Sequence, residues 1–469
     1  MIFLDHSSSL PLYKQIYTEI KDSIINGDLV EDEPLPSIRA LEKELNVSRN
    51  TVDRAYRQLV AEGYARSSQG KRFFVENIYD FDEEPDLDHA PRHSPIHQSC
   101  LPRVTYDFGF ESMESDLFPW SKWRRYLKEA VEQTQQTDVL SYGNMKGNRY
   151  LRTMLCDFLF RHRGVKAEPE QVVVGAGTQY LMDIILSLFS PLADRVAFEE
   201  PGYLAMRSLI ESRGFLVTSI PVLDSGLCSY LLGTSNSNLV YTTPSHQFPT
   251  GTALTIGMRN MLLTWAARRK DAYIIENDYD SEFRHGSLPV PSLQSLDQAQ
   301  KVIYLGTLSK LLSPGIRCAF MVLPPALLSR YEEDYRFFNA ALPEYHQIAI
   351  GRMIEDGVLD QHMRKLSTRE DRKYTLLIKS IRTYLDDRLE IVGQPAGTHV
   401  VVRIRNCRNQ EALLSELERR SIRIYSFKEH CHEKSRAYEN LFLMGYHALL
   451  EDDIPDACQA LARALEDIG

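Results

Sequence analysis

The chain has 469 residues, 43% of them hydrophobic and 25% charged, and a net charge of −10 at neutral pH. This composition is ordinary for a globular protein, and the length predicts more than one domain of about 100–200 residues. The seven cysteines form no Cys-x-x-Cys pair, so neither a metal site nor a disulfide framework is indicated. We find no secretion leader and no apolar run long enough for a bilayer, and therefore expect a cytoplasmic protein without membrane contact.

Residues 1–76 are expected to form a small helical domain. Apolar residues recur at helical spacing from Leu12 to Ile24, which predicts an amphipathic first helix. Ser37 is placed to cap a short second helix, and Ser48 to cap a third. Asn46 between them can adopt the left-handed conformation of a tight turn. Two short helices joined in this way are typical of a helix-turn-helix.

A two-stranded wing is predicted over residues 65–75, with Gln69-Gly70 at its tip. From Leu35 to Val75 the sequence holds eight basic and four acidic residues, a net charge of +4 in an otherwise acidic chain. A local basic face suits contact with nucleic acid. The alternative is a helical docking domain with solvated charges.

The motifs Leu35-Pro-Ser-Ile-Arg39, Val47–Val52 and Ala61-Glu-Gly-Tyr64 resemble the winged helix-turn-helix of GntR-type regulators. The resemblance implies binding to double-stranded DNA. The wing departs from the family pattern, because Lys71 and Arg72 replace small residues, so we expect a more electrostatic wing contact. The residues assigned to DNA contact or to its capping turn are Arg39, Ser48, Arg49, Thr51, Arg54, Lys71 and Arg72.

Residues 77–105 are predicted to be a linker. An acidic run is followed by three prolines, and nothing in the segment is periodic. Such a composition favours an extended tether. Its acids would repel DNA, so we interpret it as a spacer rather than a contact arm.

Residues 106–469 alternate short β-branched runs with helical stretches, the pattern of an α/β domain with a largely parallel sheet. After about residue 385, further strands between helices predict a smaller α+β lobe. The predicted strands include 172–174, 196–198, 240–241, 273–275, 302–305, 319–323, 398–404, 422–425 and 441–445.

The most informative stretch follows the predicted strand 302–305. Thr307 and Ser309 bracket Lys310, and Arg317 follows a Pro-Gly break. Hydroxyls, a lysine and a guanidinium suit a phosphorylated carbonyl ligand, since the lysine can form an imine while the others hold phosphate. Pyridoxal 5′-phosphate (PLP) is the commonest such ligand. The alternative is a surface lysine in a serine-rich loop.

Four other turns follow predicted strands, at residues 175–179, 199–203, 243–251 and 276–280. Because ligands of α/β proteins bind where parallel strands end, we expect these turns to meet the Lys310 segment. The first can hold phosphate through its amides, and Tyr203 in the second offers an aromatic face.

In this order the turns resemble the fold-type I, class I aminotransferase group of PLP enzymes. With the DNA-binding domain in front, the chain is identified as a member of the MocR/GabR subfamily, on the motifs Tyr241–Gly251, Tyr279-Asp-Ser-Glu-Phe283 and Gly306-Thr-Leu-Ser-Lys310. The resemblance implies a Schiff base at Lys310 and a head-to-tail homodimer in which Tyr142 reaches the neighbouring subunit's phosphate. It assigns cofactor contacts to Gly177, Thr178, Gln179, Tyr203, Asn277, Tyr279, Thr307, Ser309, Lys310, Arg317 and Tyr142.

Two departures from this subfamily bear on catalysis. Asn277 stands where a carboxylate should meet the pyridine nitrogen, and Asp278 should point to the other side of an extended segment. Aminotransferases also clamp a substrate carboxylate with an arginine, at about Leu443 here, yet no arginine lies between Arg436 and Arg463. The effector is therefore either held in another way or is not an α-amino acid.

We thus expect a transcriptional regulator that binds an operator with paired half-sites and senses a small amine, an amino acid or PLP itself. We expect at most weak transaminase activity. Two alternatives stay open: an active aminotransferase with an accessory DNA-binding domain, and a DNA-binding scaffold that has lost PLP.

Overall fold

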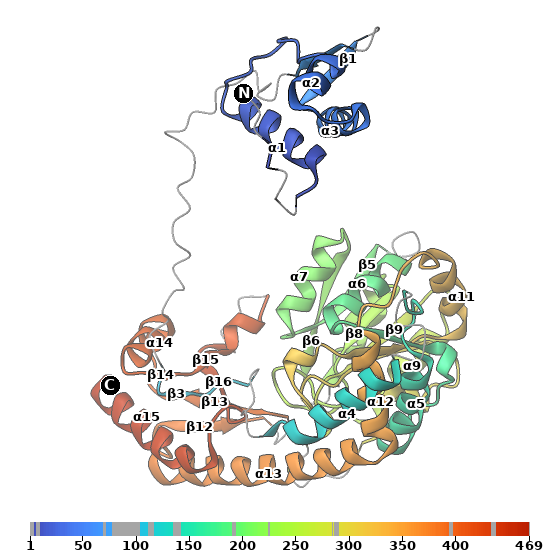
Figure 1. Cartoon of the computed structure of the whole chain (residues 1–469). Coiled ribbons are helices and arrows are strands. Elements are labelled where there is room, and N and C mark those ends of the chain that lie inside the picture. The colour runs from blue at the N-terminus through green and yellow to red at the C-terminus, as the bar shows by residue number, and fades with distance from the viewer. Residues whose placement is uncertain are drawn as a thin grey trace. The chain divides into compact units, whose positions relative to one another are not determined.

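The structure, a computed structural model, describes residues 4–5, 10–68, 72–76, 104–110, 117–134, 142–189, 194–223, 226–283, 285, 290–393, 397–432 and 438–468. The chain divides into two compact units, Met1–Ser99 and Cys100–Gly469 (Figure 1), and each is described by itself. Most of the predicted linker, the wing tip and Lys71 lie outside the described residues.

Among its described residues, the N-terminal unit has three helices and a two-stranded sheet, as predicted. Ser37 accepts a hydrogen bond from the Ala40 N–H and Ser48 from the Thr51 N–H, so both predicted caps are confirmed. Asn46 has φ of 51°, which is the predicted left-handed turn. The elements are α1 (Leu12–Ile25), α2 (Ile38–Leu45), α3 (Arg49–Ala61), β1 (Ala65–Ser68) and β2 (Arg72–Val75).

A closed apolar core holds these elements together. Ile16, Ile20 and Ile24 of α1 pack in one cluster with the inward face of α3. The Tyr56 hydroxyl donates to the Pro36 carbonyl at 2.8 Å, which ties α3 to the segment before α2. The outward residues of α2 and α3 are thus left to face solvent or a ligand.

The large unit is built on an eight-stranded sheet with the order β4-β11-β10-β9-β8-β5-β6-β7. Only β11 and β7 run antiparallel to their neighbours, so the prediction of a largely parallel sheet is confirmed. β6 and β7 have no counterpart among the predicted strands, because the partly exposed β6 lacks a continuous apolar run. The strands are β4 (Val172–Gly175), β5 (Arg195–Glu200), β6 (Leu216–Leu223), β7 (Gly226–Leu227), β8 (Leu239–Thr242), β9 (Tyr273–Asp278), β10 (Val302–Thr307) and β11 (Ala319–Val322).

Helices cover both faces of this sheet. Val172 and Val174 lie in one hydrophobic cluster, whereas Val173 between them lies in another. This alternation is expected for strands buried on both sides. α4 (Trp120–Thr134), α5 (Arg149–Arg163) and α12 (Glu344–Glu355) pack on the first face; α6 (Thr178–Phe189), α7 (Leu204–Ser212) and α11 (Pro325–Asp334) pack on the second. Three further helices lie between strands of this sheet along the chain: α8 (Ser229–Thr234), α9 (Ile256–Ala267) and α10 (Leu293–Leu296).

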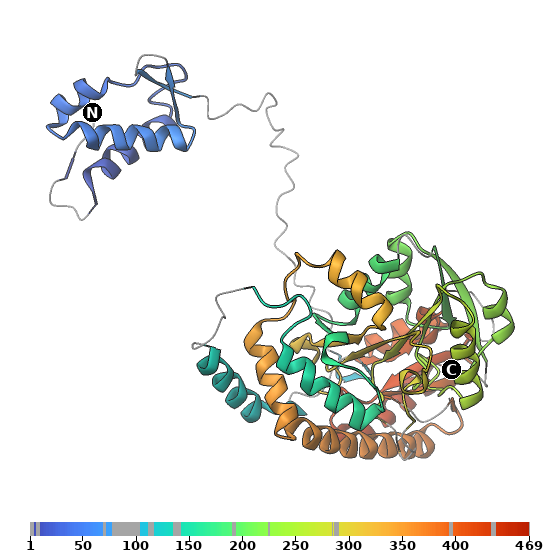
Figure 2. The same ribbon diagram turned by 90° about the vertical axis from the view of Figure 1, so that its right-hand side faces the viewer.

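A smaller lobe follows the long helix α13 (Val358–Tyr384), which runs beneath both parts of the unit (Figures 1 and 2). Its four-stranded sheet has the order β12-β13-β16-β15. The predicted strand 422–425 is instead two short strands in different sheets, because β14 pairs with β3 while β15 pairs with β16. The lobe comprises β3 (Tyr106–Asp107), β12 (Leu389–Val392), β13 (His399–Ile404), α14 (Gln410–Arg419), β14 (Ile422–Arg423), β15 (Tyr425–Ser426), β16 (Leu441–Gly445) and α15 (Ile454–Ile468).

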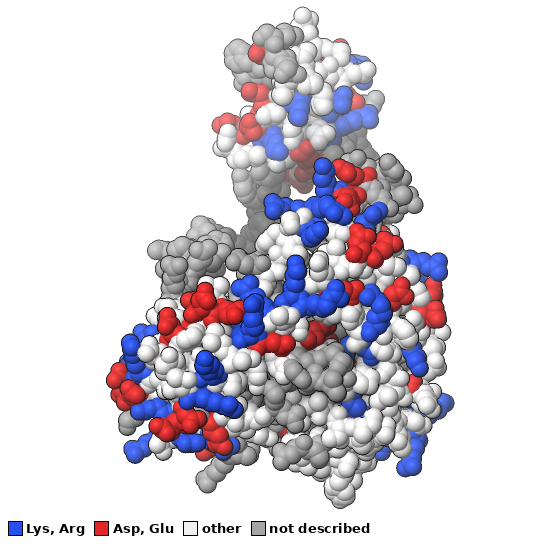
Figure 3. All heavy atoms as spheres, turned by 90° about the horizontal axis from the view of Figure 1, so that it is seen from below, with Lys and Arg blue, Asp and Glu red and all other residues white. Residues whose placement is uncertain are grey.

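One face of the large unit carries mixed charge (Figure 3). On the face seen in Figure 3, Lys and Arg side chains are interspersed with Asp and Glu. Mixed charge of this kind produces no broad field of one sign. None of the described helices combines the length and apolar character needed to span a membrane.

Candidate functional site

A cavity of about 270 Å³ opens where the parallel strands of the large unit end. Its walls come from the turns after β4, β5, β8, β9 and β10, so the predicted turns do meet the Lys310 segment. The residues that line it are Phe110, Gly177, Thr178, Tyr203, Thr243, Phe248, Asn277, Tyr279, Thr307, Ser309, Lys310, Pro314, Arg317, Thr398 and His399.

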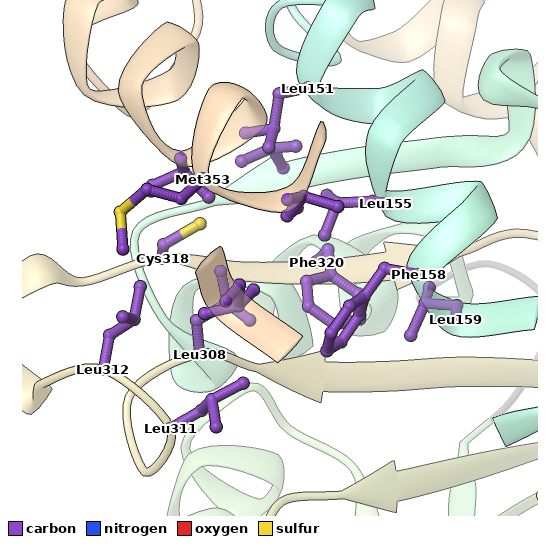
Figure 4. Packing of buried hydrophobic residues seen from close by; sticks show 14 of the residues in the cluster. Leu151, Leu155, Phe158, Leu159, Leu308, Leu311, Leu312, Cys318, Phe320 and Met353 are labelled. Atoms are coloured by element: carbon purple, nitrogen blue, oxygen red, sulfur yellow. The ribbon is translucent and has the colours of Figure 1, made fainter. Parts of the chain in front are cut away.

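Core packing positions Lys310 at this cavity. Leu308, Leu311 and Leu312 are buried in the cluster beneath the segment (Figure 4). With these side chains held in the core, Lys310 lies at the cavity, where its Nζ donates to the Phe110 carbonyl. β11 runs back antiparallel to β10 and brings Arg317, just before it, to the same cavity.

One end of the cavity is a cradle of hydrogen-bond donors. Gly177 has φ of 114°, and an added Cβ would collide with the Arg317 guanidinium. The Thr307 hydroxyl donates to the Ser309 hydroxyl at 3.0 Å, and Thr178 opens α6 beside them. Hydroxyls, a guanidinium and a helix N-terminus together suit a phosphate.

β9 presents a neutral amide to the cavity and its carboxylates to the protein interior. The Asn277 Nδ2 donates to the Tyr241 hydroxyl at 2.7 Å, and the buried Asn277 Oδ1 has no partner among the described residues. Asp278 accepts hydrogen bonds from Arg163 Nε and the Tyr304 hydroxyl, both at 2.6 Å. Asp278 does not line the cavity.

Electrostatics fix these roles. Burial alone would raise the pKa of Asp278, but Arg163 and the Tyr304 hydroxyl hold that pKa below its usual value. Burial, with the Asp278 charge nearby, raises the pKa of Glu276 to about 7. The hydrogen bonds that Glu276 accepts from the backbone N–H groups of Leu293 and Gln294 offset only part of this rise. Neither carboxyl group is therefore available to a ligand in the cavity.

Aromatic side chains form another part of the lining. The ring centroid of Phe248 lies 5.8 Å from that of Tyr203 and 6.3 Å from that of Tyr279. Burial raises the pKa of the Tyr279 hydroxyl well above its usual value, so it stays a hydrogen-bond donor. Aromatic side chains in the lining offer a surface against which a flat ring can pack.

Two residues assigned to the cofactor lie elsewhere. Gln179 is exposed and does not line the cavity, and Tyr142 is 86% exposed. Phe110 was not predicted, because no local pattern marks it. No role was predicted for His399 either, although the polar pair Thr398-His399 at the start of an apolar strand was a usable signal. The other missed lining residues are Thr243, Phe248 and Pro314.

The N-terminal unit exposes most of the basic residues assigned to DNA. Arg39 and Arg49 lie in the first turns of α2 and α3, are exposed, and make no ion pair among the described residues. Thr51 is half-buried, with its hydroxyl 2.8 Å from that of Ser48. Arg54 packs on the Tyr13 ring, and Arg72 is exposed at the start of β2.

The two units match two protein families. Residues 12–75 match the bacterial regulatory proteins of the gntR family, and residues 113–434 match aminotransferase class I and II.

Full-length relatives combine both parts. The HTH-type transcriptional regulator YdeL of Bacillus subtilis (strain 168) is 32% identical over 467 residues, covering 98% of each chain. The probable rhizopine catabolism regulatory protein MocR of Rhizobium meliloti is 30% identical over 431 residues, covering 88% of this chain and 86% of its own. Among solved structures, an archaeal alanine:glyoxylate aminotransferase superposes with a TM-score of 0.70 at 21% identity, covering 77% of this chain and 91% of its own. That likeness confirms the fold-type I architecture.

Replacing Arg163 should test the buried ion pair behind β9. We expect Arg163→Met to lower the free energy of unfolding by about 3–5 kcal/mol, because Asp278 is left buried without a counter-ion. Arg163 lowers the pKa of Asp278, so the pair contributes stability above the unfolded carboxyl pKa of about 3.9. That contribution is lost as the pH falls through the pKa of Asp278 in the folded protein. The difference in free energy of unfolding between the unmodified protein and Arg163→Met should therefore narrow only in acid.

Denaturant titration at several pH values measures this effect. Arg161→Met on the same helix is the matched control, because Arg161 is 48% exposed in its pair with Asp360. Equal losses in the two variants would contradict the assignment.

Proposed function

Because this chain belongs to the MocR/GabR subfamily of GntR-type transcriptional regulators, we propose that its aminotransferase-like domain binds PLP at Lys310 and senses a small molecule there. The sensed molecule is an amine, an amino acid or PLP itself. In this proposal residues 1–76 bind DNA, 77–105 are the linker, and 106–469 are the effector domain. A protein that reads an operator acts in the cytoplasm.

The residues at the cavity fit the cofactor. Thr178, Thr307, Ser309 and Arg317 provide donors for the phosphate, and the absence of a side chain at Gly177 leaves room for the guanidinium. The Asn277 Oδ1, which has no partner among the described residues, is a polar atom that a ligand can satisfy. When bound, PLP supplies a carbonyl for the lysine amine and an electron-withdrawing ring. Tyr203 and Tyr279 are proposed to contact that ring and its hydroxyl.

Lys310 carries the proposal, and its removal tests it. We expect purified protein with PLP to show the visible absorbance band of lysine-bound pyridoxal, and Lys310→Ala to lose it. Lys365→Ala, an exposed lysine of α13, should keep the band. A protein without the band in both its unmodified and control forms would favour the scaffold that has lost PLP.

DNA binding is proposed to use the exposed ends of α2 and α3. A helix-turn-helix docks with the start of its second helix in the major groove, where Ser48, Arg49 and Thr51 lie. Arg39 starts α2 in the same way, and Arg54, Lys71 and Arg72 are proposed to add phosphate contacts.

Arginine substitutions should separate base reading from phosphate contact. Arg39→Ala or Arg49→Ala should weaken operator binding by about 1–3 kcal/mol if the side chain reads a base. A phosphate contact would instead weaken all sequences alike and flatten the salt dependence. Fluorescence anisotropy against operator and scrambled DNA measures both, with Lys14→Ala on α1 as the charge-matched control. Unchanged binding by both arginine variants would refute the assignment.

The proposal includes a head-to-tail homodimer. Tyr142 is 86% exposed and lies outside its own cavity, as a residue that serves a partner's phosphate would. A dimer also suits an operator with paired half-sites. Light scattering of the PLP-loaded protein tests this assembly, and a monomer at micromolar concentration would contradict it.

We propose that transaminase activity is weak at most. A carboxylate beside the pyridine nitrogen would keep it protonated, and each pKa unit of such support corresponds to about 1.4 kcal/mol. Asn277 is neutral, and Asp278 is held by Arg163. The cavity can therefore bind an amine without efficiently removing a proton from it. The competing function, a working aminotransferase with an accessory DNA-binding domain, would need a charge at this position from elsewhere.

Restoring the carboxylate should raise activity. We expect Asn277→Asp to accelerate conversion of bound PLP to pyridoxamine phosphate by a reacting amine, on the order of 10²-fold. Asn277→Ala should stay slow, which would show that charge rather than size matters. Stopped-flow absorbance measures the conversion. Rapid conversion by the unmodified protein would contradict the prediction.

A further inference from the structure

The cavity wall in front of Lys310 is aromatic. The Phe110 ring centroid lies 5.8 Å from that of Phe248, 5.4 Å from that of His399 and 5.5 Å from that of Tyr425. The Phe248 centroid lies 4.7 Å from that of His430. Phe110, Phe248 and His399 line the cavity and are called the aromatic wall below; Tyr425 packs against Phe110, and His430 packs against Phe248.

The described lining of the cavity holds two cationic side chains, Lys310 and Arg317. Arg317 donates to the Ala176 carbonyl and lies against Gly177. Lys310, whose Nζ donates to the Phe110 carbonyl, is the residue proposed to hold the cofactor. Behind the wall, β16 presents only apolar residues and glycine, and Leu443 is fully buried in the cluster that contains Phe248.

Neither His399 of the wall nor His430, which packs against Phe248, adds a positive charge. Burial lowers the pKa of His399, and burial lowers that of His430 to about 4. His399 Nε2 lies 2.9 Å from the Pro249 carbonyl, an acceptor, so Nε2 carries the proton. Its Nδ1 is then a lone-pair acceptor, which repels a carboxylate.

A carboxylate placed against this wall would lose its hydration without gaining a cation. Burying a charge without a partner is strongly unfavourable. An apolar or aromatic group at the same place would gain from burial and from ring-to-ring contact. The wall therefore discriminates by charge next to the amine-binding point.

We infer that the effector is a primary amine that carries an aromatic side chain and no carboxylate. The inference rests on the proposed function, because it places the amine beside Lys310 in PLP-loaded protein. It narrows the proposed effectors from amines and amino acids in general to one chemical class.

Three matched ligands test the inference on the full-length, PLP-loaded protein. They are 2-phenylethylamine, L-phenylalaninamide and L-phenylalanine, which share the ring and the amine. The amide has the bulk of the amino acid without its charge. We expect the amine and the amide to bind at least about tenfold more tightly than L-phenylalanine in calorimetry, a difference of about 1.4 kcal/mol.

The outcomes separate this inference from the proposed function. Absence of the lysine-dependent absorbance band would refute PLP binding before any ligand is added. With the band present, equal binding of L-phenylalanine and its amide would overturn the inference and require a cation from outside the described wall. Failure of all three ligands to bind PLP-loaded protein would also overturn it.

A substitution in the wall tests the aromatic contact. In Phe248→Leu, the absorbance band measures how much PLP is bound, and binding of 2-phenylethylamine per PLP-occupied site should weaken about tenfold. Phe160→Leu is the matched control, because Phe160 is 60% exposed on α5 and does not line the cavity. Unchanged binding by Phe248→Leu would overturn the aromatic part of the inference.

Discussion

The site depends on how the segment after β10 is held in the core. Leu308, Leu311 and Leu312 are buried on the side of the sheet covered by α5 and α12. A lysine between such anchors has little freedom, because moving it would pull leucines out of a close-packed interior. The sheet places strand ends around this point, and the turns after β4, β5, β8 and β9 complete the cavity. The position of Lys310 is thus fixed by the packing of apolar side chains beneath it.

Side chains along β9 alternate between two faces of the strand, which keeps the buried carboxylates away from the cavity. Glu276 and Asp278 lie on one face of the strand and accept hydrogen bonds from α10, Arg163 and Tyr304, whereas Asn277 lies on the other. A one-residue change in register would exchange these roles. The chain has therefore kept the carboxylates that stabilise the fold while leaving a neutral side chain at the ligand. Such an arrangement favours recognition over turnover.

Features set by local chemistry could be predicted from the sequence. Ser37, Ser48 and Asn46 act within a few residues of their own positions, and the turn residues around Lys310 follow a buried strand whose apolar run is plain. Phe110 could not be predicted, because it meets Lys310 across 200 residues and its neighbours give no local signal. The split of the predicted strand 422–425 has the same cause, since its partners β3 and β16 are set by tertiary pairing. Strand β6, which lies between β5 and β7, was not predicted because its partial exposure removes the continuous apolar run.

Lys310 and Arg317 both belong to the connection between β10 and β11, two antiparallel neighbours in the sheet. A ligand that engages both ends of this connection must be released when the connection opens locally. Binding and the local opening equilibrium are then linked by mass action, so occupancy slows amide hydrogen exchange there. Ligand occupancy of the cavity is therefore coupled to the rigidity of the loop between β10 and β11. Because β11 pairs with β4, that rigidity extends to the edge of the sheet.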